Sequence, residues 1–183
     1  KPVMANWGGG IEYYLNENDY TKKASDGSAS DVANVNYAGN AMAVIKKIYT
    51  HTYKIGYDRY VLFCERMLTD DFKPIGFDVL GKERDYMLIP LFYGSIDGNG
   101  KMRSIAGQWS WGTATGNTSD TNVTANVTTE VQNAAIKKTD PEALFFGGAL
   151  MNTLADICVM LTRSTNTQAS FGAGMSTSYV NDK

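Results

Sequence analysis

Histidine and cysteine are scarce in this sequence, and their scarcity excludes several kinds of site. Of the 183 residues, one is histidine and two are cysteine. Structural zinc sites use several Cys and His ligands at short spacings, and neither Cys64 nor Cys158 belongs to a Cys-x-x-Cys motif. Two cysteines are too few for a disulfide framework, although the sequence is compatible with a single disulfide between them. Both lie in apolar runs, which favours buried free thiols.

Charged residues are also few, and their pattern argues against a nucleic-acid partner. They make up 20% of the chain, and the formal net charge is −2. The positive charges gather only as pairs such as Lys22–Lys23, whereas nucleic-acid-binding domains carry a basic patch or stripe. The hydrophobic content of 43% suffices for a core. The length predicts a single domain over residues 1–183.

No residue pattern indicates catalysis, a cofactor or a metal. His51 would need an orienting carboxylate and a nucleophile, and the sequence singles out neither, so a packed or surface histidine is favoured. The segment 97–101 imitates the start of a calcium loop, but the bidentate Glu of such a loop is missing, because position 108 is Gln. A hairpin turn is the favoured interpretation. We therefore expect a protein that is not an enzyme.

Aromatic and β-branched runs predict antiparallel strands in the first 107 residues. The stretch 85–107 predicts strand, Gly-rich turn and strand, the last part carrying Arg103 and Ser104. Pro90 lies within its first strand, which should therefore lie at a sheet edge or carry a bulge. Residues 16–40 are mostly loop formers. Further strands are expected at 11–15 and 87–93, and as a meander of 41–45, 48–53 and 60–64, with a turn at 56–58.

The later part of the chain predicts helix. Residues 128–138 have weak helical character, and a long amphipathic helix should begin at Thr139–Glu142, with Thr139 or Asp140 as cap and Pro141 in its first turn. Arg163 suits its C-terminus. Five apolar residues recur at helical spacing, which predicts a well-buried helix: Phe146, Leu150, Leu154, Ile157 and Leu161. The fold class is therefore α+β.

Trp109 and Trp111 are the candidate ligand-binding residues. They alternate in an extended segment that leads into a stretch rich in Thr, Asn and Gly, up to residue 128. Alternation would place both rings on one side, where they could stack on sugar rings or anchor a protein partner. The same two residues would also suit a hydrophobic core.

Four stretches resemble a module of phage and prophage structural proteins from gut bacteria: residues 11–34, 39–42, 102–107 and 161–172. The resemblance implies a tail-fibre, tail-tip or head-fibre adhesin with a fold similar to the C-type lectin fold. That fold is shared by phage tropism determinants and formylglycine-generating enzymes. The enzymes use a late pair of cysteines, which Cys64 and Cys158 do not match. In that fold a Trp-Gly-Asn-type segment and the ligand-facing surface come late, and this sequence stops before any such segment.

Three functions are compatible with these observations. The first is a phage virion structural protein that binds a bacterial surface glycan or protein, alongside other virion proteins and as a homo-oligomer on the particle surface. The second is a purely architectural component, such as a capsid decoration, head fibre or collar, with its long loops buried against neighbouring subunits. The third is an enzyme acting on cell-wall glycan. Because the chain begins at Lys1 and ends at Lys183 without a closing element, we expect it to be part of a longer polypeptide.

Overall fold

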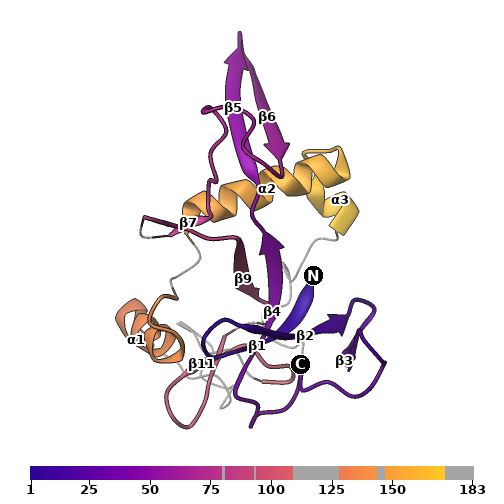
Figure 1. Cartoon of the computed structure of the whole chain (residues 1–183), viewed down its shortest axis with the longest axis vertical. Helices are drawn as coiled ribbons and strands as arrows, with labels where there is room; N and C mark the ends of the chain where they lie inside the picture. The colour runs from indigo at the N-terminus through magenta and orange to yellow at the C-terminus, as the bar shows by residue number, and fades with distance from the viewer. Residues whose placement is uncertain (80, 93, 109–127, 144–146, 172–183) are drawn as a thin grey trace. The chain divides into compact units, whose positions relative to one another are not determined.

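The computed structural model describes residues 1–79, 81–92, 94–108, 128–143 and 147–171 (Figure 1). It combines antiparallel strands with helices, which confirms the α+β class. The contacts divide the chain into two compact units. Unit 1 comprises residues 1–46 and 86–145, and unit 2 comprises residues 47–85 and 146–183. The single domain expected from the sequence stays a prediction, and each unit is described separately below.

Unit 1 is built on an antiparallel sheet in the strand order β3-β2-β1-β4-β9 (Figure 1). Its strands are β1 (Pro2–Asn6), β2 (Ile11–Asn16), β3 (Asp19–Lys23), β4 (Gly39–Lys46) and β9 (Tyr86–Pro90). The central strand β1 is apolar and buried from Pro2 to Ala5, as expected of a strand covered on both faces. The main core cluster consists of Met4, Leu15, Val32, Ala41 and Ile105.

The prediction of a continuous loop over residues 16–40 was wrong. β3 occupies Asp19–Lys23 and pairs with β2, and β4 already begins at Gly39. A tight turn joins β2 to β3, where the Asn16 side chain accepts a hydrogen bond from the Asn18 amide at 2.9 Å. Polar residues suffice for β3 because it is a largely exposed edge strand, which needs backbone pairing but no apolar face.

The strand predicted at 87–93 is β9, and its edge position is confirmed. It ends at Pro90, which pairs with Met42, and the Leu91 amide still donates to the Ala41 carbonyl at 3.2 Å. The turn predicted after it is also present. The short strands β10 (Ser95–Ile96) and β11 (Met102–Arg103) pair around residues 97–101.

Helix α1 (Thr129–Thr139) packs against β11 and confirms the weak helical signal. Thr128 caps it by accepting a hydrogen bond from the Val131 amide at 3.3 Å. At its other end, the Thr139 hydroxyl donates to the Met102 carbonyl at 2.9 Å. Ala135 is buried against Met102, so the helix and the hairpin share a small core of their own.

Unit 2 contains the antiparallel pair β5 (Tyr49–Ile55) and β6 (Asp58–Cys64), joined by the turn predicted at 56–58. The predicted meander of 41–45 with 48–53 was wrong, because β4 pairs with β1 and β9 instead of with β5. The other elements are β7 (Asp78–Val79), β8 (Lys82–Glu83), α2 (Gly148–Thr162) and α3 (Thr167–Phe171).

Helix α2 differs from the prediction in its start and in its burial. It begins at Gly148 rather than at the predicted start around Thr139. Thr139 instead belongs to the last turn of α1, and Asp140 has an extended backbone. The Asp140 side chain accepts a hydrogen bond from the Glu142 amide at 2.8 Å. Phe146 lies outside the described residues. Of the predicted apolar face Leu150 is buried, whereas Leu161 is 67% exposed, so the helix is not well buried. Arg163 forms its C-terminal cap in a left-handed conformation.

The cysteines of unit 2 are free thiols, as favoured from the sequence, but both are half-buried rather than buried. His51 of β5 is packed between rings. Its centroid lies 5.2 Å from that of Tyr53 in a stacked arrangement and 5.5 Å from that of Phe72. The structure thus agrees with a packing role for the histidine.

Candidate functional site

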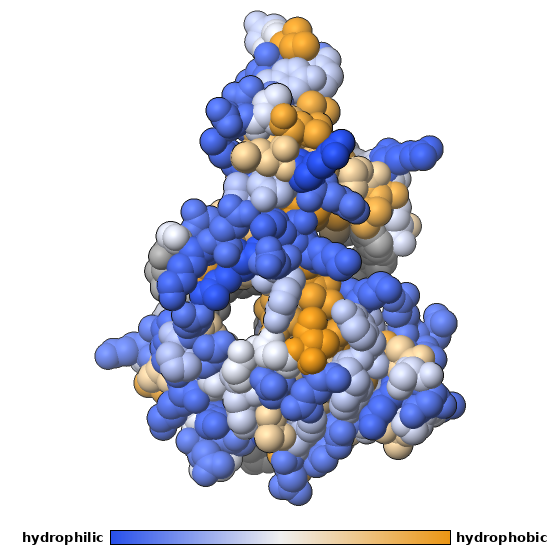
Figure 2. All heavy atoms as spheres, viewed as in Figure 1, coloured by the Kyte–Doolittle hydropathy of each residue, from blue (hydrophilic) through white to orange (hydrophobic). Residues whose placement is uncertain are grey.

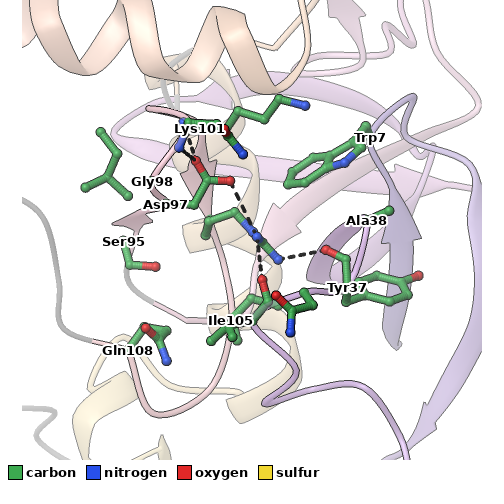
Figure 3. A pocket seen from close by; sticks show the side chains of 14 residues that line it. Trp7, Tyr37, Ala38, Ser95, Asp97, Gly98, Lys101, Ile105 and Gln108 are labelled. Carbon is green, nitrogen blue, oxygen red and sulfur yellow. Dashed lines mark hydrogen bonds and ion pairs between the residues drawn. The ribbon is translucent and has the colours of Figure 1, made fainter.

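An open hollow of about 560 Å³ in unit 1 is the candidate site (Figure 3). Such a volume is typical of small-molecule sites, which span roughly 300–1,000 Å³. Three segments far apart in the sequence form its walls: Trp7 after β1, residues 35–38 before β4, and the β10–β11 hairpin with Ile105 and Gln108 beyond it. Different local contacts hold each of the three walls in place.

Trp7 is held at the turn between β1 and β2. The Asn6 side chain accepts hydrogen bonds from the amides of Gly8 at 3.1 Å and Gly10 at 3.0 Å, which fixes the turn. Gly9 has a φ of 75°, a left-handed conformation that glycine adopts without a steric penalty. The Tyr86 hydroxyl donates to the Gly9 carbonyl at 3.1 Å. The Gly-Gly-Gly sequence therefore serves as an ordered turn that presents Trp7.

Arg103 joins the other two walls. Its side chain is buried, and its guanidinium donates to the carbonyls of Val35 at 3.1 Å and Tyr37 at 2.9 Å (Figure 3). It also donates to the Gly39 carbonyl at 3.2 Å. An ion pair of 3.6 Å connects it to Asp97. Only its Nε is buried without a hydrogen-bond partner among the described residues. Arg103 thus clamps the segment before β4 onto the β10–β11 hairpin.

Asp97 organises the turn of that hairpin. One carboxylate oxygen accepts hydrogen bonds from the amides of Asn99 and Lys101, both at 2.9 Å, and the other faces Arg103. The carboxylate is therefore committed to the turn and to the arginine. No group of three His, Cys, Asp or Glu side chains that could hold a metal ion occurs in the described part of the chain.

Two cations lie against the Trp7 ring. The Lys101 Nζ is 4.4 Å and the Arg103 Cζ 4.9 Å from its centroid, distances at which cation–π attraction acts. Lys101, Arg103 and Asp97 are the charged residues among those that line the hollow, so two positive charges and one negative leave it one net positive charge. The Arg103 guanidinium is bound to three carbonyls and to Asp97, whereas the Lys101 ammonium makes no hydrogen bond among the described residues. Three exposed carboxamides complete the lining: Asn36, Asn99 and Gln108.

The wall at 35–38 is anchored to β2 by two tyrosines. The Tyr37 hydroxyl donates to Glu12 at 2.7 Å, and the Tyr13 hydroxyl donates to Asp31 at 2.8 Å. Burial raises the pKa of Tyr37 and raises that of Tyr13 to about 12, so both remain protonated donors at neutral pH. Asp31 also accepts a hydrogen bond from the Asn34 side chain at 2.8 Å, and this bond, with that from Tyr13, lowers the Asp31 pKa.

These bonds make stability depend on pH in a defined direction. A carboxyl whose folded pKa lies below its unfolded value of about 3.9 adds stability that is present above that value. The contribution is lost as the pH falls through the folded pKa. We expect Asp31→Asn to lower the free energy of unfolding by about 1–2 kcal/mol at pH 7 and by much less at pH 3. Urea unfolding at both pH values measures the difference. Glu17→Gln changes an exposed carboxylate in the turn between β2 and β3, and it should change neither value. An equal loss at both pH values for Asp31→Asn would show that the charge plays no part.

The sequence predicted other residues than those that line this hollow. Trp109 and Trp111, the predicted ligand-binding residues, lie outside the described residues. Neither Trp7 nor Lys101 was predicted from the sequence as a site residue, and Arg103 was predicted only as part of a strand.

The three comparisons with known proteins leave this site to be interpreted from its own chemistry. No protein-family model matches the sequence, no curated protein matches it, and no solved structure matches the fold.

Proposed function

We propose that this chain is a non-catalytic structural protein of a bacteriophage virion that attaches the particle to a bacterial surface glycan or protein. The virion origin rests on the sequence resemblance of residues 11–34, 39–42, 102–107 and 161–172. The binding role is supported by one observation above all, the open hollow in which Lys101 lies on the Trp7 ring. The site offers donors and a rigid frame, without a nucleophile and base placed together among the described residues.

We further propose a C-type lectin-like fold for the chain, as the resemblance implies. The antiparallel sheet of unit 1 and the accompanying helices are compatible with that fold, although its specific topology rests on the resemblance alone. The half-buried Cys64 and Cys158 do not form a catalytic pair of the kind used by the enzymes that share it. The proposal is therefore one of recognition rather than catalysis.

The chemistry of the hollow favours a glycan with a carboxylate. The net positive charge of its lining attracts an anion. The N–H donors of the Lys101 ammonium make no hydrogen bond among the described residues and can therefore bind the anion. A charge-assisted hydrogen bond to a carboxylate is roughly twice as strong as a neutral one. The carboxamides of Asn36, Asn99 and Gln108 offer both donors and acceptors, which suits the hydroxyl groups of a sugar. An acidic bacterial polysaccharide meets both requirements.

A purely architectural role is the second candidate, and exposed apolar residues of α2 favour it. Met151, Met160 and Leu161 are each at least 50% exposed. Surfaces of this kind commonly serve as contacts between proteins.

Among the described helices, none combines the length and apolar composition that a membrane crossing needs. The adsorption experiment below separates the two roles.

We expect the fluorescently labelled full chain to bind gut bacterial cells saturably. Lys101→Glu should weaken this binding at least tenfold, because it places a negative charge where the ligand carboxylate would lie. Trp109→Ala/Trp111→Ala should weaken it too if those rings extend the site. An excess of a carboxylated monosaccharide should compete, and a neutral sugar at the same concentration should not.

Lys46→Glu is the matched control, since it makes the same charge change at an exposed position of unit 1 outside the hollow. It should bind like the unmodified chain. Equal binding by Lys101→Glu and Lys46→Glu would remove the hollow from the proposal. A folded chain that binds no cells would favour the architectural role.

A further inference from the structure

The β5–β6 hairpin of unit 2 leaves one strand edge unpaired. β5 and β6 form a sheet of two strands, and a bridge between Thr50 and Lys73 covers part of the outer side of β5. No strand or bridge of the described residues pairs with the outer edge of β6. The register between the strands is continuous from Tyr49 opposite Cys64 to Ile55 opposite Asp58, so no bulge interrupts β6. Its backbone N–H and C=O groups on that side are available to another strand.

The edges of unit 1 are protected, whereas β6 is not. β3 carries Lys22 and Lys23, and β9 ends at Pro90, two devices that discourage pairing with other chains. By contrast, β6 presents an unbroken aromatic and apolar run from Tyr60 to Cys64. Within it, Tyr60 is 39% and Leu62 43% exposed. Figure 2 shows hydrophobic residues at the surface of the part of the molecule where Figure 1 places this hairpin.

The charges around this run are arranged for pairing with an identical strand. Residues 58–66 read Asp-Arg-Tyr-Val-Leu-Phe-Cys-Glu-Arg, with Leu62 at the centre. When this segment is laid antiparallel to a copy of itself about Leu62, Asp58 faces Arg66 of the second copy and Arg59 faces Glu65 of the second copy. Both outer pairs therefore join opposite charges, and the apolar residues between them face one another.

We propose that two copies of this chain associate by antiparallel pairing of β6 with β6, centred on Leu62. The interface has two-fold symmetry, so each contact away from the axis occurs twice. In antiparallel strands, alternate residues direct their N–H and C=O groups to the same edge. When two copies pair about Leu62, even-numbered residues face even-numbered residues and odd-numbered residues face odd-numbered ones. The residues whose N–H and C=O groups point to the outer edge of β6 therefore face each other, and their backbone groups can form hydrogen bonds.

The side-chain faces agree with this register. Because successive strand residues point to opposite faces, Asp58, Tyr60 and Leu62 share one face of β6, and Arg66 follows two residues after the strand ends at Cys64. On that face the two Leu62 side chains meet on the axis, and the Tyr60 rings, each stacked on Tyr53 at 5.1 Å, extend the apolar stripe on both sides. Neither Asp58 nor Arg66 has an ion pair within the described residues. Arg59, on the other face, already binds Asp156 of α2 at 2.8 Å, so the Asp58–Arg66 pairs carry most of the charge complementarity.

The association goes beyond the proposed attachment role and does not depend on it. A symmetric pair would present two copies of the Trp7 hollow in one particle component. Two weak sites on one body bind a repeated surface far more strongly than one.

Sedimentation of the full chain across a range of concentrations tests the proposal. We expect a reversible monomer–dimer equilibrium. Leu62→Lys should raise the dissociation constant at least tenfold, because two ammonium groups would then face each other on the axis. Asp58→Arg should weaken the dimer by setting arginine against arginine twice, and Asp58→Arg/Arg66→Asp should restore it. These side chains are exposed, so circular dichroism should show an unchanged fold.

A cysteine cross-link tests the register itself. Leu62→Cys places two thiols opposite each other, within the Cα separation of about 4.4–6.8 Å that a disulfide requires. Mass spectrometry after mild oxidation should find the 62–62 link. In this register Val61 faces Phe63 of the second copy, so the two cysteines of a Val61→Cys dimer are not opposite each other. Val61→Cys should therefore give no 61–61 link. A monomer at every concentration, or a dimer indifferent to Leu62→Lys and to the charge exchange, would overturn the proposal.

Discussion

Arg103→Ala should lower the free energy of unfolding of unit 1 by about 3–5 kcal/mol, the cost typical of breaking a buried ion pair from one side. The guanidinium supplies hydrogen bonds to three backbone carbonyls and a charge to Asp97. Without it, the carbonyls of Val35, Tyr37 and Gly39 lose these donors, and the half-buried Asp97 carboxylate loses its counter-charge. Because Arg103 joins two walls of the hollow, binding should be lost along with stability.

Denaturant unfolding followed by tryptophan fluorescence measures this effect. Arg103→Lys keeps the charge but not the planar fork that reaches several carbonyls at once, so it should recover only part of the loss. Lys101→Ala is the matched control on the same hairpin. Its side chain is only half-buried, and its ammonium makes no hydrogen bond among the described residues, so truncating it should cost less than about 1 kcal/mol. If Arg103→Ala costs no more than Lys101→Ala, the clamp does not stabilise unit 1.

Gly39→Ala should have a comparable effect for a different reason. Gly39 begins β4 and pairs with Asn6 of β1. A methyl group there would overlap the Ala5 carbonyl oxygen and lie 2.8 Å from the Asn6 Cα. Both are backbone atoms of the buried central strand, which cannot move aside as a side chain could. We expect a loss of about 3 kcal/mol or more in the free energy of unfolding, and a chain that folds poorly at 37 °C.

Thermal unfolding of Gly39→Ala beside Gly98→Ala isolates the steric cause. Gly98 belongs to the same unit, and a methyl group added to it meets nothing within 4 Å. Both changes remove the conformational freedom of a glycine, but only one forces β1 and β4 apart. Similar melting temperatures for the two variants would contradict the close approach of these strands at Gly39.

Local patterns in the sequence predicted much of the fold. The turns at 56–58 and 97–101, the edge position of the strand containing Pro90 and the α+β class all follow from residues that act on their neighbours. The failures arose where local signals compete. Thr139, Asp140 and Pro141 form a good helix start, yet α1 uses Thr139 for its last turn and leaves Asp140 extended. β3 was missed because an exposed edge strand needs no apolar residues.

The candidate site was beyond such reasoning because its contacts are long-range. Arg103 binds carbonyls 64 to 68 positions earlier in the chain, and those carbonyls belong to residues whose side chains carry no signal of the contact. A tryptophan before three glycines was the one local hint of a presented aromatic ring. Even so, nothing in the sequence places the cations of β11 and its turn beside that ring.

The junction of β4 and β9 has a consequence for how such a chain can diversify. The two strands pair up to Lys46 opposite Tyr86, and the Lys47 amide donates to the Asp85 carbonyl at 2.8 Å. Residues 47–85 therefore leave and return at adjacent points, as the connection of an ordinary hairpin does. The pairing of β4 with β9 thus fixes where this segment starts and ends, so a change of length between those points does not by itself alter the register of the two strands.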